Sequence, residues 1–374
     1  MSRKYNIPVN SPLLNGNEKI YLNECIDTGW ISSEGPFVKK FEEKLSAKVD
    51  QLHGIAVSSG TAALEIAIAA LDIGKGDEVI LPSHTIISCA QAIVKNRAIP
   101  VLIDNELDTW NMDVSQIEEK ITDKTKAIMV VHLYGFPVDM DPILLIAKKH
   151  SLYIIEDTAQ MLGQTYKGQP CGSFGDISTF SFYPNKVITT GEGGMCVTSN
   201  PEIASKCRSL RNLCFEDGDR FHHNNLGWNY RMTNLQAAIG VAQLEELENH
   251  VARKKEIGNL YYELLSENLN FTISPPKNEF SENIYWVVGI MISDGLKNNA
   301  KHYMSKLESL GIGTRPFFFP MHLQPVFKDY ESFKCSDLSV SEKLHKYGFY
   351  IPCGLGITNN EIEVVSKELL TMFE

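Results

Sequence analysis

One lysine lies in an unusual setting, in the segment SFYPNKVITTGEGGM at residues 181–195. Aromatic residues precede Lys186 and a glycine-rich turn follows it, whereas a surface lysine usually lies among other charged residues. A lysine amine can form a Schiff base with an aldehyde cofactor. This setting suggests that Lys186 anchors a cofactor, although the residue taken alone also fits an ordinary surface lysine.

Two further segments carry residue types that suit a phosphorylated cofactor. In SSGTAAL, Gly60, Thr61 and Ala62 lie where an expected strand turns into a helix, and free N–H groups at a helix start favour a phosphate. In IIEDTAQ, Asp157 ends an apolar run. An aspartate there could hold a pyridinium nitrogen, so that the ring acts as an electron sink. Each segment alone also fits a capped helix start.

The three segments together favour one cofactor. A phosphate-binding turn, a strand-end aspartate and a lysine just after a serine-containing strand are the parts needed to hold pyridoxal phosphate. The dinucleotide fingerprint GxGxxG is absent from the turn at Gly60, and the glycines of GEGGM precede a strand. We therefore expect a pyridoxal phosphate enzyme and not a dinucleotide-binding one.

The elements that position these residues follow from the hydrophobic pattern. Short apolar runs rich in β-branched residues alternate with helical patterns over about the first 200 residues. This alternation predicts an α/β fold with a mostly parallel sheet covered on both faces. The expected strands are GIAVSSG (54–60), DEVILPS (77–83), IPVLIDN (99–105), KAIMVVHLYG (126–135) and LYIIED (152–157).

The pattern changes in the last third of the chain. The stretch from NYRM to YYELL predicts one long helix or a pair of helices, and a strand IYWVVGIMI and two further helices follow it. We place a domain boundary near residue 250. The expected division is a large domain at 1–250, including the N-terminal segment, and a small domain at 251–374.

Composition and charge narrow the class of protein. The 374 residues are 43% hydrophobic and 22% charged, and the net charge is −11, which argues against a nucleic-acid or anionic-membrane partner. The sequence has no apolar run of membrane-spanning length, and the N-terminus lacks a secretory signal pattern. The eight cysteines are scattered without a CxxC motif. These features predict a cytoplasmic protein with reduced cysteines and no metal site.

The chain resembles the DegT/StrS-type sugar aminotransferases, a family of fold-type-I pyridoxal phosphate enzymes. The resemblance covers nearly the whole length, and the run from GDISTFSF to GEGGM is its most specific part. It implies a large domain with a mostly parallel sheet and a smaller C-terminal α+β domain. Within the family, the chain is similar to the GDP-perosamine synthases, which aminate the 4-keto group of GDP-4-keto-6-deoxymannose. The other matching segments are SSGTAALEIAIAAL, GDEVILPSHT, HLYGFPVDMDPI, IIEDTAQ, GWNYRMTNLQAAIGVAQLE and TRPFFFPMHLQP.

The resemblance implies a role for each cofactor residue. Lys186 matches the Schiff-base lysine, and Asp157 matches the partner of the ring nitrogen. Asn229 matches an asparagine that reaches the phosphate from the neighbouring subunit, which implies a homodimer with shared active sites. The other cofactor residues are Gln160 near the ring 3-hydroxyl, Ser181 and the turn Gly60, Thr61 and Ala62 at the phosphate, and Ile86 over the ring face.

The chain departs from the family pattern at two positions. Ile86 stands where the family commonly has an aromatic residue that stacks on the cofactor. Phe319 stands where related enzymes carry His or Tyr, while His322 is retained. The expected substrate-binding residues are Trp30, Tyr183, Arg231, Phe319 and His322.

The implied reaction is a ping-pong transamination. L-glutamate donates its amino group and leaves as 2-oxoglutarate, and the amine then passes to a nucleotide-linked keto-sugar, with Lys186 as the proton-transferring base and acid. The resemblance also suggests a bacterial surface polysaccharide such as O-antigen as the destination of the product. Three alternatives remain: a UDP- or dTDP-linked or 3-keto sugar, a dehydratase on the same scaffold, and a non-catalytic sensor of the cofactor.

Overall fold

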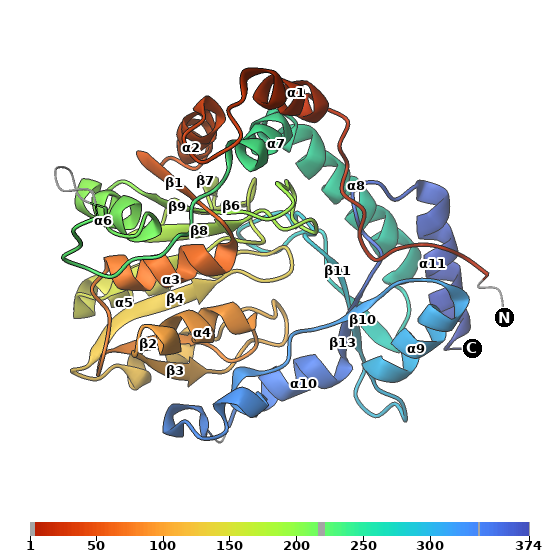
Figure 1. Ribbon diagram of the computed structural model, residues 1–374. Coiled ribbons are helices and arrows are strands. Elements are labelled where there is room, and N and C mark those ends of the chain that lie inside the picture. The colour runs from red at the N-terminus through yellow and green to blue at the C-terminus, as the bar shows by residue number, and fades with distance from the viewer. Residues whose placement is uncertain (1–3, 216–220, 336, 374) are drawn as a thin grey trace.

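The computed structural model describes residues 4–215, 221–335 and 337–373, and its largest element is a seven-stranded sheet (Figure 1). The strand order is β1-β9-β8-β5-β4-β2-β3, and β9 runs antiparallel to both of its neighbours. The other neighbouring strands pair in parallel, which confirms the predicted mostly parallel sheet. The strands are β1 (His53–Val57), β2 (Glu78–Pro82), β3 (Ile99–Ile103), β4 (Thr125–Val131), β5 (Tyr153–Asp157), β8 (Ile177–Ser181) and β9 (Gly194–Thr198).

Both faces of this sheet are buried, as the near-continuous apolar runs predict. In β4, Met129 and Val131 join the core formed with α3 and α4, whereas Ile128 and Val130 join the core formed with α5. Successive side chains of a strand point to opposite faces, so one apolar run serves both helical layers. The covering helices are α3 (Gly60–Ala70), α4 (Ile87–Lys95), α5 (Met140–His150) and α6 (Pro201–Arg211).

A second helical group lies beyond β1 and extends toward the C-terminal part of the chain (Figure 1). The helices α1 and α2 pack against α7, and α8 packs against α11. The stretch predicted as one helix or two is therefore two helices. These helices are α1 (Glu18–Thr28), α2 (Pro36–Lys48), α7 (Asn234–Glu245) and α8 (Leu247–Leu265).

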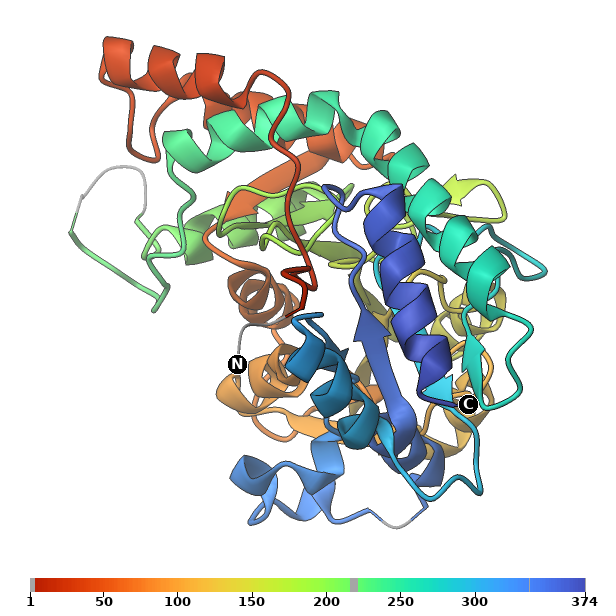
Figure 2. The same ribbon diagram turned by 90° about the vertical axis from the view of Figure 1, so that its right-hand side faces the viewer.

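The C-terminal part is built on a four-stranded antiparallel sheet of order β10-β11-β13-β12. The N-terminal segment runs from α1 toward this part (Figure 2), where Ile7 forms a parallel bridge with Ile312. The elements of the C-terminal part are β10 (Phe271–Ile273), β11 (Val288–Ile292), β12 (Arg315–Pro316), β13 (Gly348–Ile351), α9 (Ala300–Leu310), α10 (Ser339–Tyr347) and α11 (Asn359–Thr371).

The predicted boundary at residue 250 falls inside α8. Because α8 contacts both α7 and α11, the division into 1–250 and 251–374 remains a prediction. No helix among the described residues is long and apolar enough to cross a membrane. The remaining short elements are β6 (Thr165–Tyr166), β7 (Gln169–Pro170) and the 3₁₀ helices η1 (Val114–Gln116), η2 (Glu118–Lys120), η3 (Met321–Leu323), η4 (Pro325–Phe327) and η5 (Glu331–Phe333).

Candidate active site

A cavity of about 340 Å³ lies at the carboxyl ends of β5 and β8, where ligands bind in open α/β sheets. Its volume suits a small-molecule site, and residues of both sheets contribute to its wall. Seven of the residues expected to bind the cofactor line it, and so does Tyr183. The lining residues are Ser59, Gly60, Thr61, Leu64, Ile86, Ser88, Asp157, Ala159, Gln160, Thr179, Phe180, Ser181, Tyr183, Asn185, Lys186, Glu192, Trp286, Phe318 and Tyr350.

Lys186 lies in the loop between β8 and β9, with its backbone N–H donated to the carbonyl of Tyr183 at 2.9 Å. Its Nζ atom lies 4.3 Å from the centre of the Trp286 ring. The side chain reaches solvent only partly, and burial lowers the pKa of the amine to about 8, against the opposing attraction of the Asp157 carboxylate. A fraction of the amine is therefore neutral near pH 7, as a nucleophile or general base requires.

Asp157 ends β5 and is 3% exposed. Its Oδ1 accepts the N–H of Ala159 at 3.0 Å, and its Oδ2 accepts the thiol hydrogen of Cys89 at 3.3 Å. Burial raises the pKa of this carboxyl, while these two donors and the Lys186 charge oppose the rise. The site thus presents a buried carboxylate whose charge needs a cationic partner.

The wall beside Asp157 holds Gln160 and Ile86. Gln160 Oε1 accepts the N–H of Tyr134 at 2.7 Å, which fixes the amide and leaves its NH₂ end as the donor available to the cavity. Ile86 stands immediately before α4, and 38% of its surface is exposed. Its apolar side chain can cover a flat ring by dispersion contacts.

The turn at the start of α3 forms the far end of the cavity. Ser59 caps the helix by accepting the N–H of Ala62 at 3.1 Å, so the Ala62 amide is already used. Ala62 is buried behind the cavity wall, whereas Gly60 and Thr61 line it. The approach to β8 is close, because a Cβ on Gly60 would lie 2.7 Å from the Cβ of Ser181. Helix N–H groups, Thr61 and Ser181 together offer the donors that a phosphate needs.

Two polar atoms of the cavity wall have no hydrogen-bond partner among the described residues. These atoms are Thr179 Oγ1, beside Asp157, and Asn185 Oδ1, beside Lys186, and both are buried. Buried polar atoms are usually hydrogen-bonded, so unpaired ones in a cavity indicate that a ligand or water completes the site.

Besides Ala62, five residues expected at the site do not line this cavity. Asn229 is exposed, and its Oδ1 accepts the Nε–H of Arg231 at 2.9 Å. Trp30 is 49% exposed, and Phe319 packs edge-on against His345. A single chain therefore leaves these side chains outside the cavity.

His322 is the fifth of these residues, and its side chain is only 5% exposed. Its Nδ1 lies 2.8 Å from Ser83 Oγ, and its Nε2 lies 3.2 Å from Glu342 Oε1. Both ring nitrogens are engaged, one by the residue that follows β2 and the other by a residue of α10, and His322 is not among the residues that line the cavity.

Sequence reasoning missed the wall contributed by the C-terminal part. Trp286, Phe318 and Tyr350 complete the cavity around Lys186, although they lie far from it in the chain. Phe318 lies in the segment TRPFFFPMHLQP, but only its neighbour Phe319 was assigned to the site, and Trp286 lies in a run that is typical of an apolar strand. Asn185 lies in the segment SFYPNKVITTGEGGM, and its place next to Lys186 was the available signal.

A group of metal-ligand residue types lies outside the cavity. His132, Glu156 and Cys171 are buried together, and theirs is the one such cluster in the described part of the chain. Glu156 already accepts hydrogens from the amides of Gly172, Phe174 and Gly175, from Ser178 and from His132. Its carboxylate thus organises a loop and leaves no vacant coordination position.

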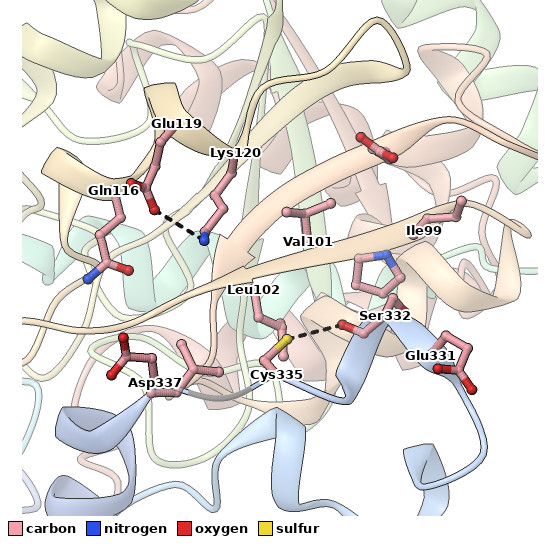
Figure 3. Close-up of a pocket in the computed structure, with 13 residues that line it drawn as sticks. Ile99, Val101, Leu102, Gln116, Glu119, Lys120, Glu331, Ser332, Cys335 and Asp337 are labelled. Atoms are coloured by element: carbon pink, nitrogen blue, oxygen red, sulfur yellow. Dashed lines mark hydrogen bonds and ion pairs between the residues drawn. The ribbon is translucent and has the colours of Figure 1, made fainter.

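A larger cavity, of about 570 Å³, lies at the β3 edge of the sheet (Figure 3). Its walls are β3 and the segment around η5, where Cys335 donates to the carbonyl of Ser332 at 3.4 Å. The Glu119–Lys120 ion pair spans 3.1 Å between neighbours in sequence (Figure 3). This cavity lacks a combination of nucleophile, base and anion-binding turn, so the smaller cavity is the candidate active site.

Comparison with known proteins gives a consistent result. The model of the DegT/DnrJ/EryC1/StrS aminotransferase family matches residues 12–370. The chain is 42% identical to the GDP-perosamine synthase of Caulobacter vibrioides over 369 residues, covering 99% of each chain. It is 41% identical to the enzyme of that name from Escherichia coli O157:H7, covering 97% of each. The structure of the Helicobacter pylori aminotransferase PseC matches with a TM-score of 0.93, at 23% identity over 99% of each chain, which confirms the predicted fold class.

Proposed function

The chain belongs to the DegT/DnrJ/EryC1/StrS aminotransferase family, and we propose that it transfers the amino group of L-glutamate to GDP-4-keto-6-deoxy-D-mannose, giving GDP-perosamine. The relatives of 38–42% identity that carry the name GDP-perosamine synthase support the choice of sugar. The observation that carries the proposal is one cavity in which Lys186, Asp157 and the α3 turn converge.

The residues of the cavity fit pyridoxal phosphate. The start of α3, Thr61 and Ser181 would hold the phosphate, and the close approach at Gly60 leaves no room for a side chain there. Asp157 would hold the ring nitrogen, Gln160 would meet the ring hydroxyl and Ile86 would cover the ring face. When bound, the cofactor supplies an electron sink for the carbon that loses or gains a proton.

Two side chains control the protons of the proposed reaction. Lys186 is partly neutral near pH 8, so its Nζ can accept a proton from the substrate carbon and return it at a neighbouring carbon. Asp157 remains an acceptor because Ala159 and Cys89 donate to it, and its charge holds a proton on the ring nitrogen. The wall of Trp286, Phe318 and Tyr350 limits the access of water to Lys186.

The proposal includes a homodimer in which Asn229 reaches the phosphate of the partner's site. The exposed position of Asn229, outside its own chain's cavity, supports this arrangement. Large apolar side chains exposed near it and on α1 also support it, because such patches mark interfaces. These include Ile20 at 63%, Ile26 at 64% and Leu226 at 95% exposed. Trp30 and Arg231 would then reach the sugar site of the assembled dimer.

We place this reaction in the cytoplasm and in the supply of a surface polysaccharide. All eight cysteines are free thiols, which supports a reducing compartment. A relative of 32% identity carries the name spore coat polysaccharide biosynthesis protein, which supports a glycan destination.

A different nucleotide sugar is the second candidate. A relative of 36% identity carries the name dTDP-3-amino-3,6-dideoxy-alpha-D-galactopyranose transaminase. That name supports testing dTDP-linked and 3-keto sugars beside the GDP-linked 4-keto sugar.

The test is the visible spectrum of the protein with added pyridoxal phosphate, before and after L-glutamate. We expect a visible band of the lysine-bound cofactor that fades as 2-oxoglutarate is released. GDP-4-keto-6-deoxymannose should restore the band, whereas UDP- and dTDP-linked keto-sugars should restore it more slowly. A band that glutamate does not change would indicate another donor, a dehydratase or a sensor, and no band at all would remove the cofactor from the proposal.

A further inference from the structure

Trp286 makes two separate contacts with the segment that carries Lys186. The residue is 4% exposed and precedes β11. Its indole N–H donates to the backbone carbonyl of Asn185 at 2.9 Å. The centre of its ring lies 4.3 Å from Lys186 Nζ, within the range of a cation–π contact.

We propose that Trp286 is a positioning residue that holds the Lys186 amine on its ring face whenever this amine is not bonded to the cofactor. The inference deepens the proposed function and rests on it. Only a lysine that bonds to the cofactor leaves it and returns to it in each half-reaction. In the structure, the Lys186 amine lies over the face of the indole ring.

The other groups around the amine do not provide an equivalent contact. Asp157 on β5 and Cys89 on α4 act on the Lys186 charge, yet no ion pair between described residues includes this amine within 4 Å. Glu192 and Tyr183 line the cavity on the side of the β8–β9 loop. The indole face is therefore the direct contact of the charged amine.

The ring itself is held in place by aromatic neighbours. Tyr134 stacks on Trp286 with centroids 6.1 Å apart and an interplanar angle of 19°. Tyr350 lies tilted at 6.3 Å on the neighbouring strand β13. A ring fixed in this way offers a constant surface to the lysine, because the core around it leaves few alternative rotamers.

The two contacts have separable consequences. The negative face of the indole ring stabilises the ammonium form and so opposes the lowering of the amine pKa by burial. The N–H bond to Asn185 fixes the backbone from which the lysine extends. A Trp286→Phe variant keeps a ring and loses the N–H, whereas Trp286→Leu loses both.

The experiment measures the pKa of the Lys186 amine in the full-length cofactor-free protein. The rate of acetylation by acetic anhydride is followed against pH, and the Lys186 peptide is quantified by mass spectrometry. We expect wild type to titrate near 8. Trp286→Leu should titrate about one pH unit lower, and Trp286→Phe should fall between them.

The matched control is Trp110→Phe, which removes an equally buried tryptophan that does not line the cavity. Its Lys186 should titrate as in wild type. A second readout is the pH profile of the glutamate half-reaction in the loaded enzyme, which should shift in the same direction in the Trp286 variants. If Trp286→Leu fails to fold, Trp286→Phe decides the question.

An unchanged Lys186 pKa and pH profile in folded Trp286 variants would overturn the inference. An equal change in Trp110→Phe would do the same, since any core substitution would then suffice. Failure of the proposed function is recognised separately, because wild type itself would show no spectral response to pyridoxal phosphate and glutamate.

Discussion

The Cys89 thiol lies 3.3 Å from Asp157 Oδ2 and donates its hydrogen to that carboxylate. Both side chains are buried. Helix α4, which carries Cys89, therefore supports Asp157, the residue proposed to hold the ring nitrogen. The donor lowers the proton affinity of a carboxyl whose pKa burial raises. Asp157 thereby keeps the negative charge that the proposed chemistry needs.

Replacing Cys89 by alanine should weaken cofactor binding. The loss of one hydrogen bond to the buried carboxylate is worth about 1 kcal/mol, or roughly a fivefold rise in the Kd for pyridoxal phosphate. Cys89→Ser should keep near wild-type affinity, because a hydroxyl also donates. Equilibrium titration by absorbance measures both variants, and equal losses in the two would show that packing and not the donor matters.

Lys186→Ala should abolish transamination while the protein stays folded. Removal of both the covalent anchor and the proton carrier should lower turnover by at least about a thousandfold. The measurement is 2-oxoglutarate release, with circular dichroism as the check on folding. Substantial turnover by the folded variant would exclude Lys186 from its assigned role.

Lys186 should also cost the cofactor-free protein stability at neutral pH. Its pKa of about 8 lies below the unfolded value of 10.5, so the unfolded chain binds more protons between these pH values. The free energy of unfolding should therefore rise with pH from about 8 to 10.5. Below pH 8 the protein carries the full cost of burying the protonated Lys186 amine. Lys186→Met should be more stable than wild type at pH 7 by up to about 3 kcal/mol. Solvent that reaches the partly exposed amine screens its charge and reduces this difference.

Denaturant unfolding of both proteins at pH 7 and pH 10 checks this expectation. The advantage of Lys186→Met should shrink at pH 10, where the wild-type amine is neutral in the folded protein. An advantage that does not change with pH would point to a packing effect in place of the titration of Lys186.

The sequence was sufficient for the elements that carry local signals. The apolar runs predicted β1 to β5 to within a few residues, and the chain order of Gly60, Asp157 and Lys186 predicted residues that the fold brings to one cavity. These successes share a cause, since strand periodicity and strand-end position are local properties.

The rest of the site depended on tertiary arrangement. Trp286 reaches Lys186 only because the four-stranded sheet packs against the cavity, and no local pattern encodes that packing. His322, expected at the sugar, has its ring nitrogens engaged by Ser83 and Glu342 from two distant elements. The roles of Trp30 and Asn229 stay predictions, because they depend on a second subunit.

Mixing two inactive variants tests the shared site directly. If Asn229 serves the partner's phosphate, Asn229→Asp should repel that phosphate and inactivate the partner's site. A heterodimer with Lys186→Ala then keeps one intact site, because its working lysine and asparagine come from different chains. Random mixing should restore about a quarter of wild-type activity.

A doubly substituted chain provides the control for this complementation. A chain that carries both substitutions, mixed with Lys186→Ala alone, should stay inactive because no site has both groups. If the single variants stay inactive after verified subunit exchange, Asn229 acts within its own chain or not at all.

Gly60→Ala should weaken cofactor binding without unfolding the protein. The added Cβ would lie 2.7 Å from the Cβ of Ser181, so the α3 turn and β8 must move apart where the phosphate is proposed to bind. Overpacking of this kind costs about 1–3 kcal/mol, and we expect at least about a fivefold rise in the Kd for pyridoxal phosphate. Gly74→Ala is the matched control, since its nearest neighbour would be the Asn96 carbonyl at 3.8 Å. If both variants bind the cofactor as wild type does, the phosphate lies elsewhere than at the start of α3.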